Sequence, residues 1–177
     1  MTIHSKIPSI GLGTYMMSPE EAEEMTYEAI KIGYRHIDTA EVYRNEQGVA
    51  KGIERSLSEG LVSRSELFIT TKVFPGNEIW GQSQKTFDDV TESLDNSLKR
   101  LKLEYVDLYL IHSAHANKTR IEQWKALLEL KSMGKITYAG VANWNIKHLQ
   151  EINDSDLPLP DTNQIELHPW AQQPELV

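Results

Sequence analysis

The sequence contains no cysteine, which excludes disulfide bonds and thiolate metal sites. It has no run of lysines and arginines, and 26 acidic residues outnumber 18 basic ones, for a formal net charge of -8. Nucleic acids bind basic tracks, so a nucleic-acid partner is not expected. No apolar run is long enough to cross a bilayer, and residues 1–6 have no apolar signal-peptide core. We therefore expect a cytoplasmic protein with no membrane partner.

What the chain has instead is a regular alternation of apolar runs and amphipathic helical patterns. Six apolar runs rich in β-forming residues predict strands at about residues 7–14, 35–40, 67–72, 106–112, 136–143 and 162–166. Helical spacing of apolar residues predicts helices at about 18–33, 46–59, 86–101, 121–131 and 146–152. The alternation of strands and helices indicates a parallel sheet in an α/β fold.

The first helix carries a strong start signal. Ser18 is a typical capping residue, Pro19 suits the first helical position, and Glu21 follows the cap by three residues. Gly33 marks the end of this helix. Helical spacing predicts an inward face made of Ala22, Met25, Ala29 and Ile32.

The type of parallel sheet follows from a missing motif and from the length. Both a closed barrel and a doubly wound sheet bind ligands at the carboxyl ends of their strands. The Gly-x-Gly-x-x-Gly fingerprint of many doubly wound nucleotide-binding folds is absent, which favours the barrel. Eight strand–helix units need about 250 residues, whereas this chain has 177. We expect residues 1–177 to form one incomplete domain, a parallel (β/α) TIM-type barrel with about six of the eight units.

Reactive side chains stand where three predicted strands end. Asp38, Lys72 and His112 close apolar runs, and Tyr43 lies in the loop after the first of them. A tyrosine has an ordinary pKa of about 10, and an ammonium group about 4 Å away contributes up to about 4 kcal/mol at an effective dielectric near 20. Lys72 is therefore expected to lower the pKa of Tyr43 by up to roughly three units, which makes Tyr43 a general acid.

In this arrangement Asp38 keeps Lys72 charged, and His112 orients the oxygen of a substrate. Such a site protonates an oxygen while another group attacks carbon, which fits carbonyl reduction by hydride from a nicotinamide. Two other chemistries stay open. Lys72 is a possible Schiff-base amine, and a hydrolytic metal site is possible at four residues: His112, His115, Glu166 and His168.

Motifs in a fixed order connect the sequence to a known family. They lie at residues 11–14, 33–40, 43–46, 70–72, 98–101, 105–112, 134–136 and 163–169. On these motifs, which cover nearly the whole chain, the sequence resembles the aldo-keto reductase family of NADPH-dependent (β/α)8 barrels. The resemblance implies reduction of an aldehyde or ketone by NADPH. It also implies that Tyr43 donates the proton within a catalytic tetrad of Asp38, Tyr43, Lys72 and His112.

The resemblance also implies the cofactor-binding residues. Thr14 and Asp38 match family residues near the nicotinamide riboside, and Asn143 and Gln164 match the pair that holds the carboxamide. The chain departs from the family pattern at Ala142, where the family usually has a serine that contacts the carboxamide.

On the substrate side, Tyr15 and Phe74 stand where the family often has tryptophan, and Ser113 follows His112 where many members have an aromatic residue. These departures predict an altered substrate pocket that is roomier beside His112, lined in part by Tyr15, Phe74 and His112.

Family members continue for roughly another hundred residues beyond the last matching position. From this we expect the seventh and eighth strands, a tyrosine that stacks on the nicotinamide and the basic loop that grips the adenosine phosphates to be missing. Phosphate sites in this fold often follow strands seven and eight. An open sheet also leaves two unpaired edges, which favour self-association. The alternative function is therefore a non-catalytic fragment that does not bind NADPH on its own.

Overall fold

A computed structural model describes residues 6–177, so residues 1–5, where no signal peptide is expected, lie outside the described residues. Within this range six parallel strands alternate with five α-helices. The strands are β1 (Leu12–Gly13), β2 (His36–Asp38), β3 (Phe68–Val73), β4 (Val106–Ile111), β5 (Ile136–Ala142) and β6 (Asn163–Gln164). The α-helices are α1 (Pro19–Lys31), α2 (Glu46–Ser58), α3 (Phe87–Leu101), α4 (Arg120–Ser132) and α5 (Ile146–Asp154). Three single-turn 3-10 helices are η2 (Glu41–Tyr43), η3 (Arg64–Glu66) and η4 (Glu78–Trp80).

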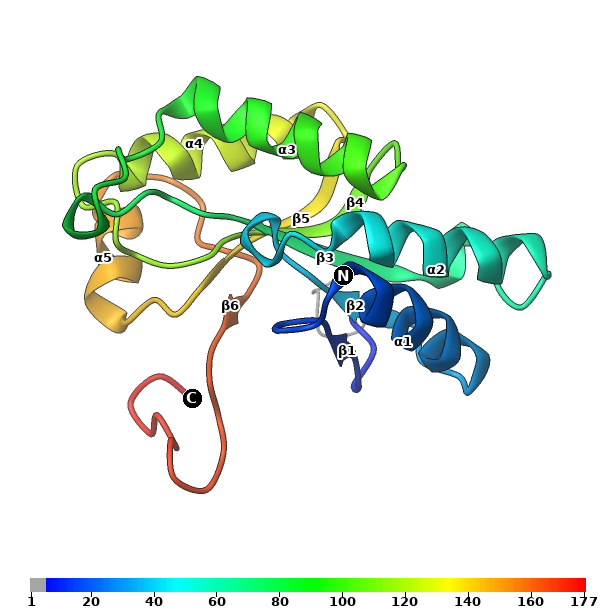
Figure 1. The fold of residues 1–177 in the computed structure, drawn as a ribbon. Helices are drawn as coiled ribbons and strands as arrows, with labels where there is room; N and C mark the ends of the chain where they lie inside the picture. Colours follow the sequence, from blue (N-terminus) through cyan, green and yellow to red (C-terminus); the bar gives the residue numbers. More distant parts are fainter. Residues whose placement is uncertain (1–5) are drawn as a thin grey trace.

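The strands lie in the sheet in the order of the chain, from β1 to β6. Helices α1 to α4 lie together on one side of this sheet, and the segment after β6 extends away from it (Figure 1). A doubly wound sheet would reverse its strand order and carry helices on both faces. The strands form a curled half-barrel, which confirms the predicted parallel α/β barrel with six strands.

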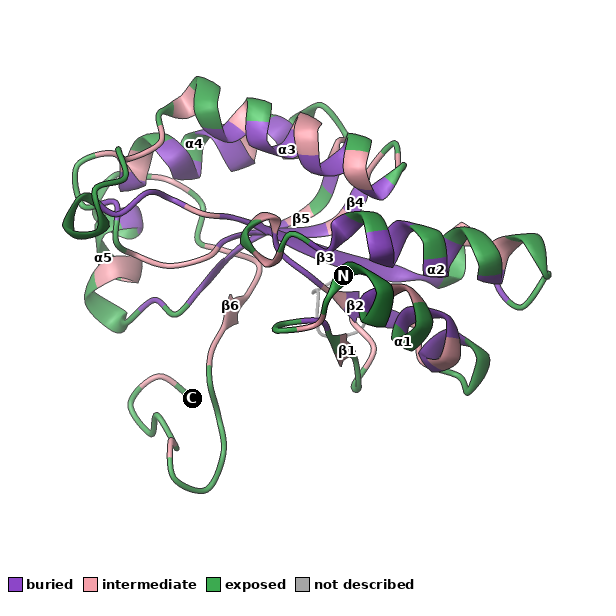
Figure 2. Ribbon diagram, viewed as in Figure 1, coloured by how far each residue is buried: buried purple, intermediate pink, exposed green. Residues whose placement is uncertain are grey.

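Two apolar clusters lie on the two faces of the sheet. The larger one joins the buried sides of the helices to the outward residues of the strands, and Figure 2 shows this buried layer between helices and sheet. The smaller one, on the inner side of the curl, consists of Phe68, Leu108, Leu110 and Ala142. In residues 6–177 no helix combines the length and the apolar character needed to span a membrane.

Local sequence signals locate the helix starts well. Ser18, Thr86 and Asn145 each form a capping box at the start of α1, α3 and α5. The two edge strands are shorter than predicted: β1 and β6 have two residues each, whereas 7–14 and 162–166 were expected. An edge strand has one neighbour only, so extended residues beyond the shared register form no ladder.

The predicted inward face of α1 is wrong at two positions. Met25 is 43% exposed and Ile32 is 72% exposed, whereas Ala22 and Ala29 are buried as predicted. The face that packs is completed by other residues of α1, namely Thr26, Tyr27 and Ile30.

Two glycines of α2 lie where this helix crosses α1. A Cβ atom on Gly48 would lie 2.0 Å from the carbonyl oxygen of Pro19, and one on Gly52 would lie 2.7 Å from the Cβ of Thr26. The two helices therefore touch backbone to backbone. At this crossing Thr26 meets Gly52 and is buried, whereas its neighbour Met25 is exposed.

This close approach predicts the effect of Gly48→Ala. Alanine favours a helix over glycine by about 1 kcal/mol. The clash with Pro19 outweighs that gain, so we expect Gly48→Ala to lower the free energy of unfolding by about 1–3 kcal/mol. Urea unfolding measures the change. Gln47→Ala, at the exposed neighbouring position, is the matched control and should change stability by no more than about 0.5 kcal/mol. Equal stability of the two variants would contradict the packing described here.

Candidate active site

Four predicted catalytic residues meet at the carboxyl ends of three neighbouring strands. Asp38 ends β2, Tyr43 ends η2, Lys72 lies near the end of β3, and His112 follows β4. Lys72 Nζ forms an ion pair with Asp38 and lies 5.2 Å from the centre of the Tyr43 ring. The hydroxyl of Tyr43 lies 3.3 Å from Nε2 of His112. The structure therefore brings all four together at one edge of the sheet.

Lys72 is the most deeply buried charge of this group, with 2% of its side chain exposed. Besides Asp38, its ammonium group donates a hydrogen bond to the carbonyl oxygen of Thr39 at 3.1 Å. Burial lowers the pKa of Lys72 below its ordinary value, and the negative charge of Asp38 acts against this shift. The contact with Asp38 was predicted, whereas the dominant effect of burial was not.

The pKa of Tyr43 moves in the direction opposite to the prediction. Burial raises it from 10 to about 12, and the charge of Asp38 adds to the increase. Two features explain the difference. Asp38 balances the positive charge of Lys72, and the ammonium group lies beside the tyrosine ring without a hydrogen bond to its hydroxyl. Tyr43 is therefore fully protonated at neutral pH.

His112 is neutral at the same pH. Burial lowers its pKa from 6.5 to about 4, and the positive charge of Lys72 lowers it further in the same direction. A neutral imidazole has one N–H donor and one acceptor nitrogen. It can therefore share a hydrogen bond with the hydroxyl of Tyr43 and with an oxygen of a bound molecule.

The loop that carries Tyr43 is fixed by Glu41, which the sequence analysis did not single out. One carboxylate oxygen of Glu41 accepts hydrogen bonds from the backbone N–H of Phe74 and from Nζ of Lys85, both at 2.6 Å. Phe74 comes two residues after Lys72 along β3 and its extension. Glu41 thus ties the tyrosine loop to the strand that supplies the lysine.

Asn45 and Glu46 hold the other end of this loop, although the sequence motif gave them no role. The amide of buried Asn45 donates to the carbonyl oxygens of Thr14 at 2.8 Å and Met17 at 3.1 Å. Glu46 accepts from Thr71 at 2.7 Å and from Arg100 at 2.5 Å. The motif around Tyr43 is therefore anchored on both sides.

The predicted cofactor residues lie at the same edge of the sheet. Thr14 is fully buried, and its hydroxyl donates to the backbone carbonyl of Asp38 at 3.1 Å. Asn143 has a left-handed φ of 61°, and its side-chain amide donates to the carbonyl oxygen of His112 at 3.1 Å. Gln164 donates to Asp38 at 2.8 Å.

Both amide side chains keep a free acceptor. Each side chain donates its N–H group to a protein oxygen. Among residues 6–177 the side-chain oxygens of Asn143 and Gln164 accept no hydrogen bond. Two amide oxygens at this edge suit a group with N–H donors, such as a carboxamide. These residues therefore fit the predicted nicotinamide contact.

On the substrate side, the exposed ring of Tyr15 lies 5.1 Å from the ring of Tyr43. The ring of Phe74 stacks on Trp80 at 6.2 Å, and Trp80 meets His115 edge-on. His115 in turn shares a 2.8 Å hydrogen bond with Ser113, the residue after His112. Aromatic and polar groups thus form a continuous wall beside the reactive residues.

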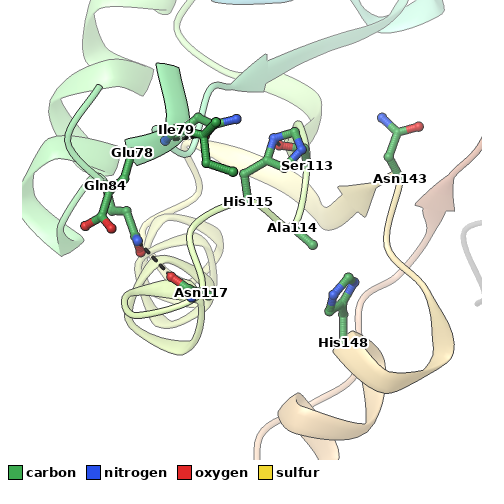
Figure 3. A pocket seen from close by; sticks show the side chains of 10 residues that line it. Glu78, Ile79, Gln84, Ser113, Ala114, His115, Asn117, Asn143 and His148 are labelled. Carbon is green, nitrogen blue, oxygen red and sulfur yellow. Dashed lines mark hydrogen bonds between the residues drawn. The ribbon is translucent and has the colours of Figure 1, made fainter. Parts of the chain in front are cut away.

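A cavity of about 510 Å³ lies behind this wall (Figure 3). Ser113 and His115 of the β4–α4 loop line one side of the cavity, and Asn143 and His148 line another. Glu78 of η4 lines a third side. Asp38, Tyr43, Lys72 and His112 do not line it. The cavity comes near these four residues at Ser113, which follows His112, and at Asn143, whose side chain bonds the carbonyl oxygen of His112.

The alternative metal site finds no support in the geometry. Within the described residues no three histidine, aspartate or glutamate side chains are grouped so as to hold a metal ion. His168 and Glu166 bond to each other at 2.7 Å, in the segment after β6. His112 bonds to Tyr43 instead.

Comparison with known sequences identifies the family. The model of the Aldo/keto reductase family matches residues 9–177. The chain belongs to this family. It is 43% identical over 171 residues to methylglyoxal reductase DkgA of Escherichia coli (strain K12), covering 96% of this chain and 58% of that protein. It is 42% identical over 173 residues to glyoxal reductase of Bacillus subtilis (strain 168), covering 97% of this chain and 58% of that protein.

Solved aldo-keto reductases share the fold. The Brucella melitensis aldo/keto reductase superimposes with a TM-score of 0.85 at 40% identity, over 96% of this chain and 62% of that one. The Bombyx mori enzyme, crystallised in complex with NADP, gives a TM-score of 0.85 at 35% identity, over 97% of this chain and 58% of that one. The chain thus spans less than two thirds of the length of these relatives.

The lowered pKa of His112 predicts how stability depends on pH. The unfolded chain protonates this group near pH 6.5 and the folded chain near pH 4. The contribution of neutral His112 to the free energy of unfolding is complete above pH 6.5. It is lost as the pH falls toward 4, because the unfolded chain then binds a proton that the folded chain does not. We expect it to amount to about 2–3 kcal/mol of unfolding free energy.

Urea unfolding of the wild type and of His112→Asn between these pH values measures the effect. The wild type should lose more stability on acidification than the variant. His36, whose pKa burial also lowers, remains in both proteins, so its contribution cancels in the difference. Parallel stability curves for the two proteins would show that His112 is not a buried neutral group.

Proposed function

We propose that this chain reduces an aldehyde or ketone to an alcohol with hydride from NADPH, and that Tyr43 supplies the proton. The observation that carries the proposal is the meeting of two bonded pairs, Lys72 with Asp38 and Tyr43 with His112, at the carboxyl edge of a parallel barrel sheet. The family, the relatives named methylglyoxal and glyoxal reductases, and the NADP complex of a solved relative support it.

The chemistry agrees with the observed protonation states. A phenol with a pKa of about 12 keeps its proton at neutral pH. An alkoxide formed from a carbonyl is about as basic as hydroxide, whose conjugate acid has a pKa of about 15.7. Proton transfer from Tyr43 to that oxygen is therefore downhill. Neutral His112, 3.3 Å from the Tyr43 hydroxyl, orients the same oxygen.

NADPH, when bound, supplies the hydride. The free side-chain oxygens of Asn143 and Gln164 would accept hydrogen bonds from the carboxamide. Asp38 and Thr14 would hold the riboside, and the hydroxyl of buried Thr14 bonds the backbone carbonyl of Asp38. Ala142 offers no hydroxyl, so these two amides carry the carboxamide contact.

The substrate is proposed to be a small carbonyl compound that carries further oxygen atoms. Ser113 and His115 form a polar wall beside His112, and Ser113 stands where many family members have an aromatic residue. Tyr15 and Phe74 supply the apolar sides. A cytoplasmic location belongs to the same proposal.

A second candidate is a fragment that keeps the catalytic residues without binding NADPH and that self-associates through its edges. Two observations favour it. β1 and β6 each pair with a single neighbour within the described sheet, and Trp170 after β6 is 91% exposed. Unpaired strand edges are templates for association.

NADPH titration separates the two candidates. If the chain is a reductase, NADPH should quench the fluorescence of its four tryptophans saturably, and an aldehyde such as methylglyoxal should then be reduced. Tyr43→Phe should bind NADPH as tightly as the wild type and lose at least about a hundredfold in rate, because it lacks the acid. No binding up to millimolar NADPH would reject the reductase and leave the fragment, which should elute as an oligomer on size exclusion.

A further inference from the structure

Gln164 makes a contact that its place in the sheet does not require. It lies on β6, which pairs only with β5, whereas Asp38 lies on β2, four strands away in the sheet order. Nevertheless Nε2 of Gln164 donates a 2.8 Å hydrogen bond to Oδ2 of Asp38 across 126 residues of sequence. The bond therefore crosses the inner side of the curled sheet from one side to the other.

This bond divides the carboxylate of Asp38 between two partners. Oδ1 accepts from Lys72, and Oδ2 accepts from Gln164. A carboxylate held at one oxygen can still rotate about its terminal bond, because that torsion is soft. A second donor on the other oxygen fixes the plane of the carboxylate and, with it, the position of the ammonium group.

Gln164 also connects the two halves of the site. Its backbone carbonyl accepts from the N–H of Asn143 at 2.8 Å, and the side chain of Asn143 donates to the carbonyl oxygen of His112. His112 meets Tyr43 at 3.3 Å. A path of hydrogen bonds therefore runs from Asp38 through Gln164 and Asn143 to His112.

We propose that Gln164 is a positioning residue for the catalytic Lys72–Asp38 pair, in addition to the cofactor contact proposed above. The catalytic role of that pair rests on the function proposed above, whereas the positioning rests on the contacts alone. A charged carboxylate only accepts hydrogen bonds, so the position requires a donor. It follows that a glutamate at position 164 works when it is protonated and fails when it is ionised.

The test observes the Lys72 ammonium group directly, by ¹⁵N NMR of the lysine-labelled 177-residue chain without NADPH. The measured quantity is the exchange rate of the Nζ protons with water, relative to the wild type at each pH. Gln164→Leu should raise this rate about tenfold or more, which corresponds to the loss of one hydrogen bond to a charged group. Gln150→Leu, the same change at an exposed glutamine whose side chain bonds Asp154, should leave the rate unchanged.

Gln164→Glu provides the decisive comparison. Its carboxyl group lies beside Asp38, which raises its pKa above the ordinary value of about 4.3. The relative exchange rate should equal that of the wild type at low pH and rise to that of Gln164→Leu as the glutamate ionises. A purely structural role would give no such recovery.

Three results would overturn the proposal. They are unchanged Lys72 exchange in Gln164→Leu, a relative rate in Gln164→Glu that does not vary with pH, and equal acceleration of Lys72 and of the backbone amides of β5, which would indicate general loosening. Because the readout needs neither NADPH nor turnover, a failed cofactor titration leaves this test intact, and a failed test leaves the titration intact.

Discussion

The arrangement at the carboxyl edge of this sheet depends on Lys72, a charged side chain that is only 2% exposed. Withdrawing such a charge from water costs several kcal/mol, which only close partners can offset. Asp38 and the carbonyl oxygen of Thr39 supply them, and both come from the end of β2. The parallel pairing of β2 with β3, with Asp38 opposite Thr70, brings these groups together.

The charge balance around Lys72 explains the protonation of its neighbours. Because Asp38 balances the ammonium group, little positive potential remains to ionise Tyr43, and burial keeps its proton in place. The same burial keeps His112 neutral. Tyr43 and His112 therefore both stay neutral over a wide range of pH beside the Lys72–Asp38 ion pair, and they can share a proton.

The sequence predicts those parts of the structure that depend on neighbours in the chain. The capping residues Ser18 and Asn145 locate helix starts, and polar residues at the ends of apolar runs locate the active edge. Contacts between distant elements were not predictable in this way. The close crossing of α1 and α2 at Gly48 and Gly52 is one example, because it depends on which residues of two helices face each other. The pKa of Tyr43 required knowledge of burial and of where Asp38 lies.

The backbone at Asn143 has a consequence for how this position can vary. Its φ of 61° is a conformation that asparagine and glycine tolerate and most other residues resist. Its side chain meanwhile joins the loop after β4 to the end of β5. Glycine would satisfy the backbone and lose the amide, whereas glutamine would keep an amide and strain the backbone. Almost every substitution of Asn143 would therefore lose either the backbone conformation or the amide contact, although the side chain is exposed to solvent.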